Sequence, residues 1–368
     1  MSRPKMPGTA GPARSGPSRP TMRHVAALAG VGTKTVSRVV NGEPNVSAAT
    51  IERVRQAIER LRYQPNPDAA NLKRANGRTL TLGFLVENLA DPFSAAVLRA
   101  IEEEAWDRKT AVISASHGCD PERELQIINN FLGRRVDGII LGPAKGRHSF
   151  RALEAAQGTS LVFLGALPMG VPADAVTTDN AAGAGQAADH LLGLGHRRIA
   201  YCGAVPASAG DVAAGERYRG FMAKLGQAGI TSSDIPVLQN LRDAESARHE
   251  IARLIRSGPR PTAIFTAGSA GTAGAIKALR ENGMNNSIAV VGFDDFPHAD
   301  LADPGITVIA QDAEGIGRIA ADRLFARMDG FSGEPATHLI PATLKERGSG
   351  EIRPRSASRR PSVSAGIS

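Results

Sequence analysis

The spacing of hydrophobic residues changes near residue 78 and divides the chain into two parts of different character. Before this point, apolar residues recur three or four positions apart in three short segments, which predicts three helices. Thr21 and Ser47 are the expected caps of the first and third helices, and the second covers residues 33–40. After this point, short continuous apolar runs alternate with helical stretches, as expected of parallel strands covered on both faces.

The second part of the chain predicts a doubly wound α/β fold with two parallel sheets. Its apolar runs and helical stretches follow one another as repeated βα units. The predicted strands are Leu80–Val86, Ala111–Ala115, Gly138–Leu141, Leu161–Leu164, Ile199–Gly203, Thr262–Ala267, Ile288–Gly292 and Ile306–Ala310. The predicted helices include Ser94–Arg108, Pro121–Arg134, Gly183–Leu194, Ala213–Leu225 and Gly271–Arg280.

In the first part, the first two predicted helices fit a helix-turn-helix. Ala26 is small enough for two helices to cross closely, and Gly30 can adopt the positive φ that the turn requires. Val36 and Val39 supply the apolar inner face of the second helix. Its outward positions are Thr33, Lys34, Ser37 and Arg38. Lys and Arg can donate hydrogen bonds to guanine in the major groove, although a small helical bundle with a solvated basic face is the alternative.

Basic residues are concentrated in the first fifth of the chain. Residues 1–74 hold 13 of the 44 Lys and Arg but only 4 of the 36 Asp and Glu, so they carry more than the whole net charge of +8. A basic head on a near-neutral body indicates binding to a polyanion such as DNA, and a solvated basic tail is the alternative. Residues 1–20 and 346–368 are rich in Arg with Pro, Gly or Ser, and we expect both segments to be disordered.

Composition and motif searches exclude several classes of protein. No stretch approaches the roughly 18 apolar residues that a transmembrane helix requires. Residues 1–20 lack the apolar segment of a signal peptide, so we expect a cytoplasmic protein. Cys119 and Cys202 lie far apart and form neither a disulfide framework nor a zinc cluster, which fits a reducing compartment.

Two sequence fragments resemble enzyme motifs without the required context. The segment 183–188 matches a dinucleotide fingerprint, but no strand leads into its glycines. Ser269 lies one glycine short of a nucleophile elbow and has no identifiable His and Asp partners. The histidines at positions 117, 148, 190, 196 and 298 show no metal-ligand spacing. We therefore predict no enzyme activity, no cofactor and no metal.

The sequence TVSRVVNG over residues 35–42 is followed by Val46-Ser47 and by Tyr63-Gln64-Pro65-Asn66. With these intervals it resembles the DNA-binding head of the LacI/GalR family of bacterial transcriptional regulators. Core stretches are similar to the family as well, namely residues 91–93, 120–122, 135–140, 194–200, 217–221 and 291–295. The resemblance covers about residues 21–345. It implies a helix-turn-helix head, a hinge helix, and a two-lobed core like that of periplasmic sugar-binding proteins.

The resemblance assigns DNA contacts to the head and hinge. It implies that Thr33, Lys34 and Arg38 contact bases. It also implies that Leu72, followed by Lys73, inserts into a minor-groove step and kinks the duplex, although Leu72 as an ordinary buried linker residue is the alternative. The full predicted DNA-binding set is Thr21, Thr33, Lys34, Ser37, Arg38, Asn41, Leu72 and Lys73.

Two residues of the head depart from the family pattern. The family usually has Ser at the position of Gly32, so the cap of the second helix passes to Thr33 or is lost. The family often has Asp at the position of His24. Both departures make the operator sequence harder to predict.

In the core, the resemblance implies that Arg217 and Asp294 contact an effector in a cleft at the carboxyl ends of the strands. A guanidinium and a carboxylate can bind hydroxyls or a carboxylate, whereas a structural surface ion pair is the alternative. Phe93 is a third effector-binding candidate because it could stack on a ring, although it could equally be a core residue. Gly165 and Gly268-Ser269 stand where family members carry polar ligand groups. This disfavours a plain hexose and leaves a larger, acidic or less polar effector open.

The sequence predicts five segments with distinct roles. They are a disordered basic arm (1–20), a helix-turn-helix domain (21–66), a hinge helix and linker (67–77), an effector-binding core (78–345) and a disordered tail (346–368). Within the core, the N-terminal lobe is expected to take about 78–177 and 309–340, and the C-terminal lobe about 178–308.

We therefore expect a sequence-specific DNA-binding transcriptional regulator. In this hypothesis a homodimer represses from a pseudo-palindromic operator, and a sugar or sugar derivative bound between the core lobes controls its affinity. A regulator that needs its ligand as a co-repressor is one alternative. A solute-binding protein sharing the core fold is another, but it would need an export signal and no DNA-binding head. A nonspecific DNA-coating protein would lack the small-molecule core.

Overall fold

The computed structural model describes residues 20–64, 78–144, 158–166, 171–205, 212–239, 241 and 243–354. The chain folds as two compact units, Met1–Thr79 and Leu80–Ser368. The predicted arm up to residue 19, the predicted hinge over 67–77, and the last part of the predicted tail, 355–368, lie outside the described residues.

The described part of the first unit contains helices α1 Met22–Ala29, α2 Thr33–Val40 and α3 Ala48–Leu61, as the hydrophobic spacing predicts. The apolar faces of all three helices meet in one cluster. Its buried members are Val25, Ala26, Ala29, Val36, Val54, Ala57 and Tyr63. Gly30 ends α1 at a φ of 65°, in the left-handed region that glycine adopts without steric cost. The predicted helix-turn-helix is therefore confirmed.

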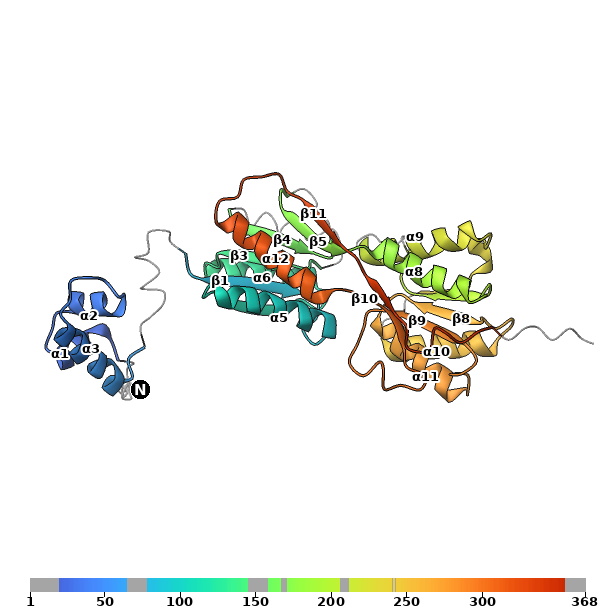
Figure 1. The fold of residues 1–368 in the computed structure, drawn as a ribbon, viewed down its shortest axis with the longest axis horizontal. Helices are drawn as coiled ribbons and strands as arrows, with labels where there is room; N and C mark the ends of the chain where they lie inside the picture. The colour runs from blue at the N-terminus through green and yellow to red at the C-terminus, as the bar shows by residue number, and fades with distance from the viewer. Residues whose placement is uncertain are drawn as a thin grey trace, which may run out of the picture. The chain divides into compact units, whose positions relative to one another are not determined.

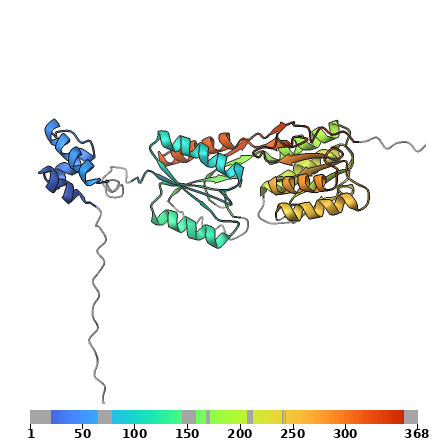
Figure 2. The same ribbon diagram turned by 90° about the horizontal axis from the view of Figure 1, so that it is seen from below.

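The N-terminal lobe of the second unit is built on a parallel six-stranded sheet in the order β11-β5-β4-β3-β1-β2. Its strands are β1 Thr81–Val86, β2 Ala111–Ser116, β3 Gly138–Leu141, β4 Ser160–Leu164, β5 Asp174–Thr178 and β11 Thr337–Ile340. Helices α5 Pro92–Asp107 and α12 Ala313–Met328 cover one face, and α6 Pro121–Gly133 covers the other (Figure 2). Phe84 packs toward α5 and α12, whereas its neighbour Leu85 packs toward α6, because successive strand residues face opposite sides.

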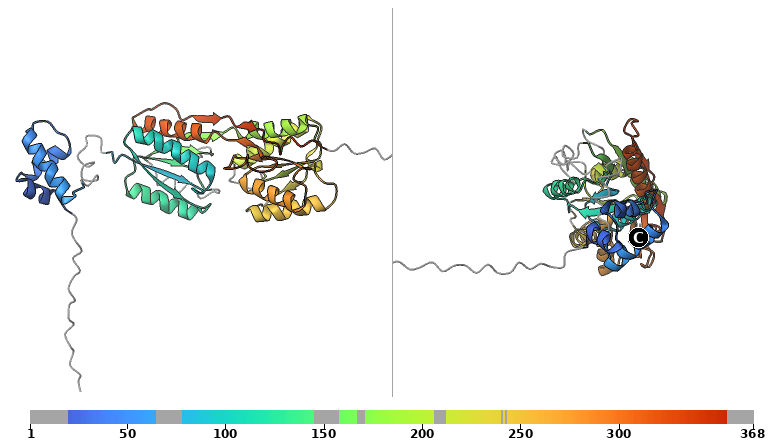
Figure 3. Two further views of the ribbon diagram at one scale, coloured as in Figure 1. Left: turned by 60° about the horizontal axis from the view of Figure 1, so that its bottom comes forward. Right: turned by 90° about the vertical axis from the view of Figure 1, so that its left-hand side faces the viewer.

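The C-terminal lobe repeats this plan with the order β12-β10-β9-β8-β6-β7. Its strands are β6 Ile199–Cys202, β7 Val237–Leu238, β8 Ala263–Thr266, β9 Ala289–Phe293, β10 Thr307–Ala310 and the antiparallel edge strand β12 Thr343–Lys345. Helices α8 Asn180–Gly193 and α9 Val212–Gln227 cover one face. Helices α10 Ala244–Arg256 and α11 Ser269–Glu281 cover the other, and a short 3-10 helix, η1 Ser232–Asp234, precedes β7. The predicted two-lobed α/β core is confirmed (Figure 3).

The chain passes between the lobes three times, after β5, after β10 and after β11 (Figure 1). The backbone N–H of Asp179 in the first crossover donates to the carbonyl of Ile340 at 2.9 Å, close to the third. The side chain of Thr178 donates a hydrogen bond to that of Gln311 in the second crossover. The three crossovers are therefore joined to one another by hydrogen bonds. A change in the angle between the lobes must act on all of them together.

Strand β5 shows why the sequence analysis misses four of the strands, namely β5, β7, β11 and β12. It contains Asp174 and two threonines, so it does not form a continuous apolar run. The structure buries Asp174 completely by pairing its carboxylate with Arg323 at 3.2 Å and Arg327 at 2.8 Å, both on α12. These partners lower the pKa of Asp174 to about 2 against the opposing effect of burial.

The predicted lobe and tail boundaries need correction. Strand β10 remains in the C-terminal sheet as far as Ala310, so the second crossover lies at residues 311–312 rather than before 309. Residues 346–354, predicted as disordered, pack against the C-terminal lobe. Buried Ser349 donates to the carbonyl of Val290 at 2.7 Å and accepts the N–H of Thr307 at 2.9 Å. These polar residues satisfy neighbouring backbone groups, which hydrophobic spacing does not reveal.

Candidate functional site

A cavity of about 280 Å³ lies between the two lobes of the core. It opens at the carboxyl ends of β1, β4 and β5 of one lobe and of β9 of the other, where ligands of doubly wound folds bind. Its described lining is apolar on much of the N-terminal side, and its polar groups gather near the crossovers. The polar lining residues are Glu87, Asp91, Ser94, Thr177, Thr178, Asn180, Arg217, Asp294 and Gln311.

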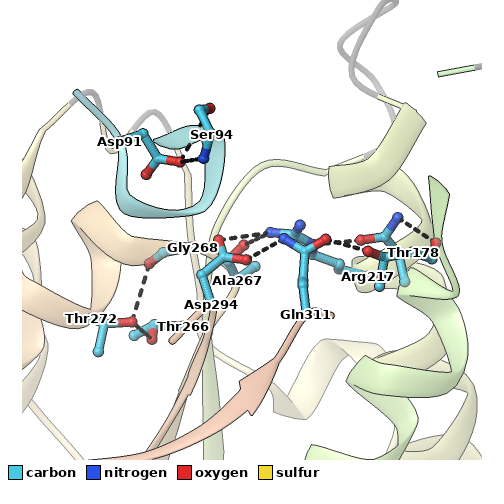
Figure 4. A network of polar contacts seen from close by, with 11 residues as sticks. Asp91, Ser94, Thr178, Arg217, Thr266, Ala267, Gly268, Thr272, Asp294 and Gln311 are labelled. Carbon is cyan, nitrogen blue, oxygen red and sulfur yellow. Dashed lines mark hydrogen bonds and ion pairs between the residues drawn. The ribbon is translucent and has the colours of Figure 1, made fainter. Parts of the chain in front are cut away.

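Arg217, on α9, is held in place by four contacts. Its Nε donates to Oδ1 of Asn180 and its Nη1 to the carbonyl of Ala267, both at 2.8 Å (Figure 4). Nη1 lies 3.5 Å from Oδ2 of Asp294. The guanidinium also lies over the ring of Phe293, 3.8 Å from its centroid. The side chain is 12% exposed, so it is fixed before any ligand enters the cavity.

Asp294 follows β9 directly and has a φ of 79°. A non-glycine residue in the left-handed region is strained, and such strain persists where the surrounding structure imposes it, often at functional sites. Oδ1 of Asp294 accepts a hydrogen bond of 2.5 Å from Nε2 of Gln311. The structure therefore brings the two predicted effector residues, Arg217 and Asp294, together at the cavity.

A continuous set of polar contacts leads from this pair to the crossovers (Figure 4). Gln311 donates to Asp294 and accepts from the hydroxyl of Thr178. Asn180 accepts from Arg217 and donates to the carbonyl of Thr178 at 3.0 Å. The sequence analysis does not find Thr178, Asn180 or Gln311. Gln311 could have been predicted as a site residue, because it is the first polar residue after a predicted strand.

Asp91, at the N-terminus of α5, is a polar cavity residue from the N-terminal lobe. Its Oδ2 accepts the backbone N–H of Ser94 at 3.1 Å and caps the helix. Burial raises the pKa of Asp91, the capping hydrogen bond lowers it, and the like charge of Asp294 raises it further. The sequence analysis uses Asp91 only as part of a family motif and not as a site residue.

Phe93 lines the cavity and is half-buried. It also packs against the apolar cluster under α5 and α12. Both sequence interpretations, a ring-stacking residue and a core residue, are therefore compatible with its position.

Two buried side chains hold the cavity wall that follows β3. The ring Nε2 of His117 lies 2.8 Å from the carbonyl of Gly142, and Oε2 of Glu124 accepts the N–H of Ala144 at 2.6 Å. Gly142 and Ala144 line the cavity. Burial raises the pKa of the Glu124 carboxyl. The described residues contain no group of three His, Cys, Asp or Glu placed to hold a metal ion.

Most of the predicted DNA-contacting residues of the head lie on α2 or at its C-cap, Asn41, whereas Thr21 is the exposed N-cap of α1. Thr33, Lys34, Arg38 and Asn41 are exposed, and Ser37 is half-buried. Nε of Arg38 lies 3.8 Å from a carboxylate oxygen of Glu43, and both side chains are about half exposed, so the pair is open to competition by phosphate. Leu72 and Lys73 lie outside the described residues.

The two departures from the family pattern have different consequences in the structure. Gly32 is the N-cap of α2 and offers no side-chain hydrogen bond, so the cap of this helix is lost. Nδ1 of His24 accepts the backbone N–H of Thr21 at 3.1 Å, so His24 satisfies an N–H at the start of α1.

Among the described residues, every helix is too short or too polar to cross a lipid bilayer.

Two family models match the chain, bacterial regulatory proteins of the lacI family over residues 21–66 and a periplasmic binding protein-like domain over residues 188–350. The HTH-type transcriptional regulator CelR of Thermobifida fusca is 33% identical over 341 residues, which cover 90% of this chain and 98% of CelR. Catabolite control protein A of Priestia megaterium is 28% identical over 331 residues, covering 89% of this chain and 98% of that protein.

Solved structures agree with this relationship. The lac repressor dimer bound to operator and the anti-inducer ONPF has a TM-score of 0.78 and 28% identity, over 90% of this chain and 99% of that one. The complex of the regulator CelR with cellobiose has a TM-score of 0.65 and 31% identity, over 90% of this chain and all of that one (100%). The chain belongs to the LacI family of bacterial regulatory proteins and is a DNA-binding transcriptional regulator, not an enzyme.

Proposed function

We propose that this regulator is a repressor whose operator affinity is controlled by a small molecule bound to Arg217 and Asp294, with Phe93 against it. The observation that carries the proposal is the placement of the Arg217–Asp294 pair. It lies at a cavity between two lobes and is hydrogen-bonded to a crossover through Gln311. A ligand that changes this pair therefore acts directly on the segments that set the angle between the lobes.

On the DNA side, Thr33, Lys34 and Arg38 contact bases, while Thr21, Ser37 and Asn41 support the contact around α2. Thr33, Lys34 and Arg38 are exposed on α2, the second helix of the helix-turn-helix, and this exposure supports their assignment. Leu72 inserts into a minor-groove step, and the neighbouring Lys73 is a further DNA-binding residue. The protein binds as a homodimer to a pseudo-palindromic operator, and the operator-bound dimer of the lac repressor supports the dimer. We place this regulator in the bacterial cytoplasm.

The effector is a sugar or sugar derivative. The cellobiose complex of CelR, a relative over nearly its full length, supports this class. Effector binding releases the operator in this proposal. A co-repressor, the second candidate, would instead raise operator affinity.

The test is a selection of operator sequences from random DNA, followed by titration of the selected duplex with and without each member of a sugar panel. We expect a pseudo-palindromic sequence bound by a dimer, and a lower operator affinity with the effector present. A higher affinity with effector would favour the co-repressor. Binding to an asymmetric single half-site would contradict the dimer, and the absence of a response to any small molecule would contradict effector control.

A further inference from the structure

The charges that line the described part of the cavity are unbalanced. Arg217 carries the positive charge, while Asp91 and Asp294 carry carboxylates. The Arg217 guanidinium is already paired with Asp294, and it donates to Asn180 and to a backbone carbonyl. It therefore has little capacity to compensate the charge of an anionic ligand.

Asp91 and Asp294 approach the cavity from opposite lobes. Asp91 is the N-cap of α5 in the N-terminal lobe, and Asp294 follows β9 in the C-terminal lobe (Figure 4). The two carboxylates repel each other, and Asp294 contributes to the raised pKa of Asp91. A third negative charge would enter a partly buried site where solvent screens like charges weakly.

Asp91 also occupies the place where an anion would otherwise bind. The N-terminus of a helix attracts anions through its free N–H groups and its dipole. In α5, however, the carboxylate of Asp91 accepts the N–H of Ser94 itself. The protein's own side chain therefore takes the anion position nearest to the cavity.

The rest of the described lining contains no further basic side chain. It is mostly apolar, with Phe84, Val86, Phe93, Val97, Leu164, Val176, Val212 and Ile316. Burying an unpaired charge against such a wall is costly, whereas the C–H face of an uncharged ring gains by contact with it.

We propose that Asp91 is a specificity-determining residue that disfavours the binding of anions in the cavity. The effector is then an uncharged polyhydroxy compound and not a sugar acid or sugar phosphate. This inference rests on the proposed effector role of the cavity. Hydroxyl groups can donate to Asp294 and Asp91 and accept from Arg217, and they bring no net charge.

The test compares the full-length wild-type protein with Asp91→Asn. Asparagine keeps the shape of the side chain and is an equally good helix cap, so α5 is preserved while the charge is removed. Asp120→Asn is the matched control, because Asp120 caps α6 of the same lobe in the same way and does not line the cavity. The probes are neutral mono- and disaccharides, each paired with its aldonic acid and its phosphate, and the measurements are thermal shift and calorimetric Kd.

We expect uncharged members to stabilise the wild-type protein and to bind more tightly than their acids. In Asp91→Asn the ratio of the two affinities should shift toward the acid by about tenfold, the size of an interaction of one pKa unit. Asp120→Asn should keep the wild-type ratio. The inference is overturned if an acid binds the wild-type protein as tightly as its neutral partner, if no uncharged member stabilises it, or if the ratio is unchanged in Asp91→Asn.

The outcomes separate this inference from the proposed function. An acid that binds the wild-type protein and releases the operator would leave effector control intact and refute only the role of Asp91. Operator affinity that responds to no neutral or anionic member would count against effector control itself.

Discussion

Gln311 donates a hydrogen bond of 2.5 Å from Nε2 to Oδ1 of Asp294, the carboxylate whose other oxygen faces Arg217. One carboxylate is thus shared between a residue of the second crossover and the guanidinium at the cavity. In the proposed function, this contact is where a ligand at the cavity would act on the angle between the lobes.

Replacing Gln311 should weaken the effector response and leave operator affinity without effector nearly unchanged. Gln311→Ala removes a hydrogen bond to a charged group, worth about 1.5–3 kcal/mol, from the contact between crossover and cavity. Gln311→Glu should have a larger effect because it places a second carboxylate against Asp294. Operator titrations with and without effector measure both variants, and an unchanged effector response in both would refute the coupling role of Gln311.

Arg217→Ala should abolish the response to effector while the protein still folds, dimerises and binds the operator. Arg217→Lys should rescue little, because an ammonium cannot reproduce the planar set of contacts to Asn180 and Ala267. Operator titration combined with sedimentation measures the result. Loss of operator binding by a folded, dimeric Arg217→Ala without effector would instead make Arg217 a structural residue.

Lys34→Ala and Arg38→Ala should each lower operator affinity by about 1–3 kcal/mol and relax preference at defined base positions. Arg60→Ala, an exposed basic residue near the end of α3, is the control for the loss of one positive charge. Binding to the operator and to random duplex is compared at several salt concentrations. If Arg38→Ala weakens both duplexes equally, Arg38 contacts phosphate and not a base.

The ion pairs of buried Asp174 should make the stability of the N-terminal lobe fall at acidic pH. Its pKa is lowered to about 2 in the folded protein, below its ordinary value of 3.8. A lowered pKa stabilises the folded state above pH 4, and this contribution, about 2 kcal/mol, is lost as the pH falls from about 4 to about 2.

Asp174→Asn should flatten this part of the pH dependence. It should also destabilise the protein at neutral pH by about 3–5 kcal/mol, because it leaves Arg323 and Arg327 without their shared carboxylate. Urea unfolding between pH 7 and pH 3 measures both effects. An unchanged slope in the variant would show that other carboxylates dominate acid unfolding.

Features that depend only on neighbours along the chain can be predicted from the sequence. Gly30 ends a helix because it adopts a positive φ, and Val25, Ala26 and Val36 are buried because they share faces of short helices. Apolar runs such as the one in β1 formed strands, because a strand covered on both faces needs apolar side chains on both. These local rules were sufficient for the helix-turn-helix and for the α/β core.

Which polar side chains meet depends on how the chain folds in three dimensions. Thr178 and Gln311 are 133 residues apart, Asp174 and Arg327 are 153 apart, and Ser349 reaches Val290 across 59 residues. Such pairs depend on the return of the chain between lobes and on the order of strands, which hydrophobic spacing does not encode. For this reason the sequence identified Arg217 and Asp294 through a family resemblance but not the partners that orient them. The placement of Asp91 and Asp294 at the same cavity likewise depends on how the two lobes face each other.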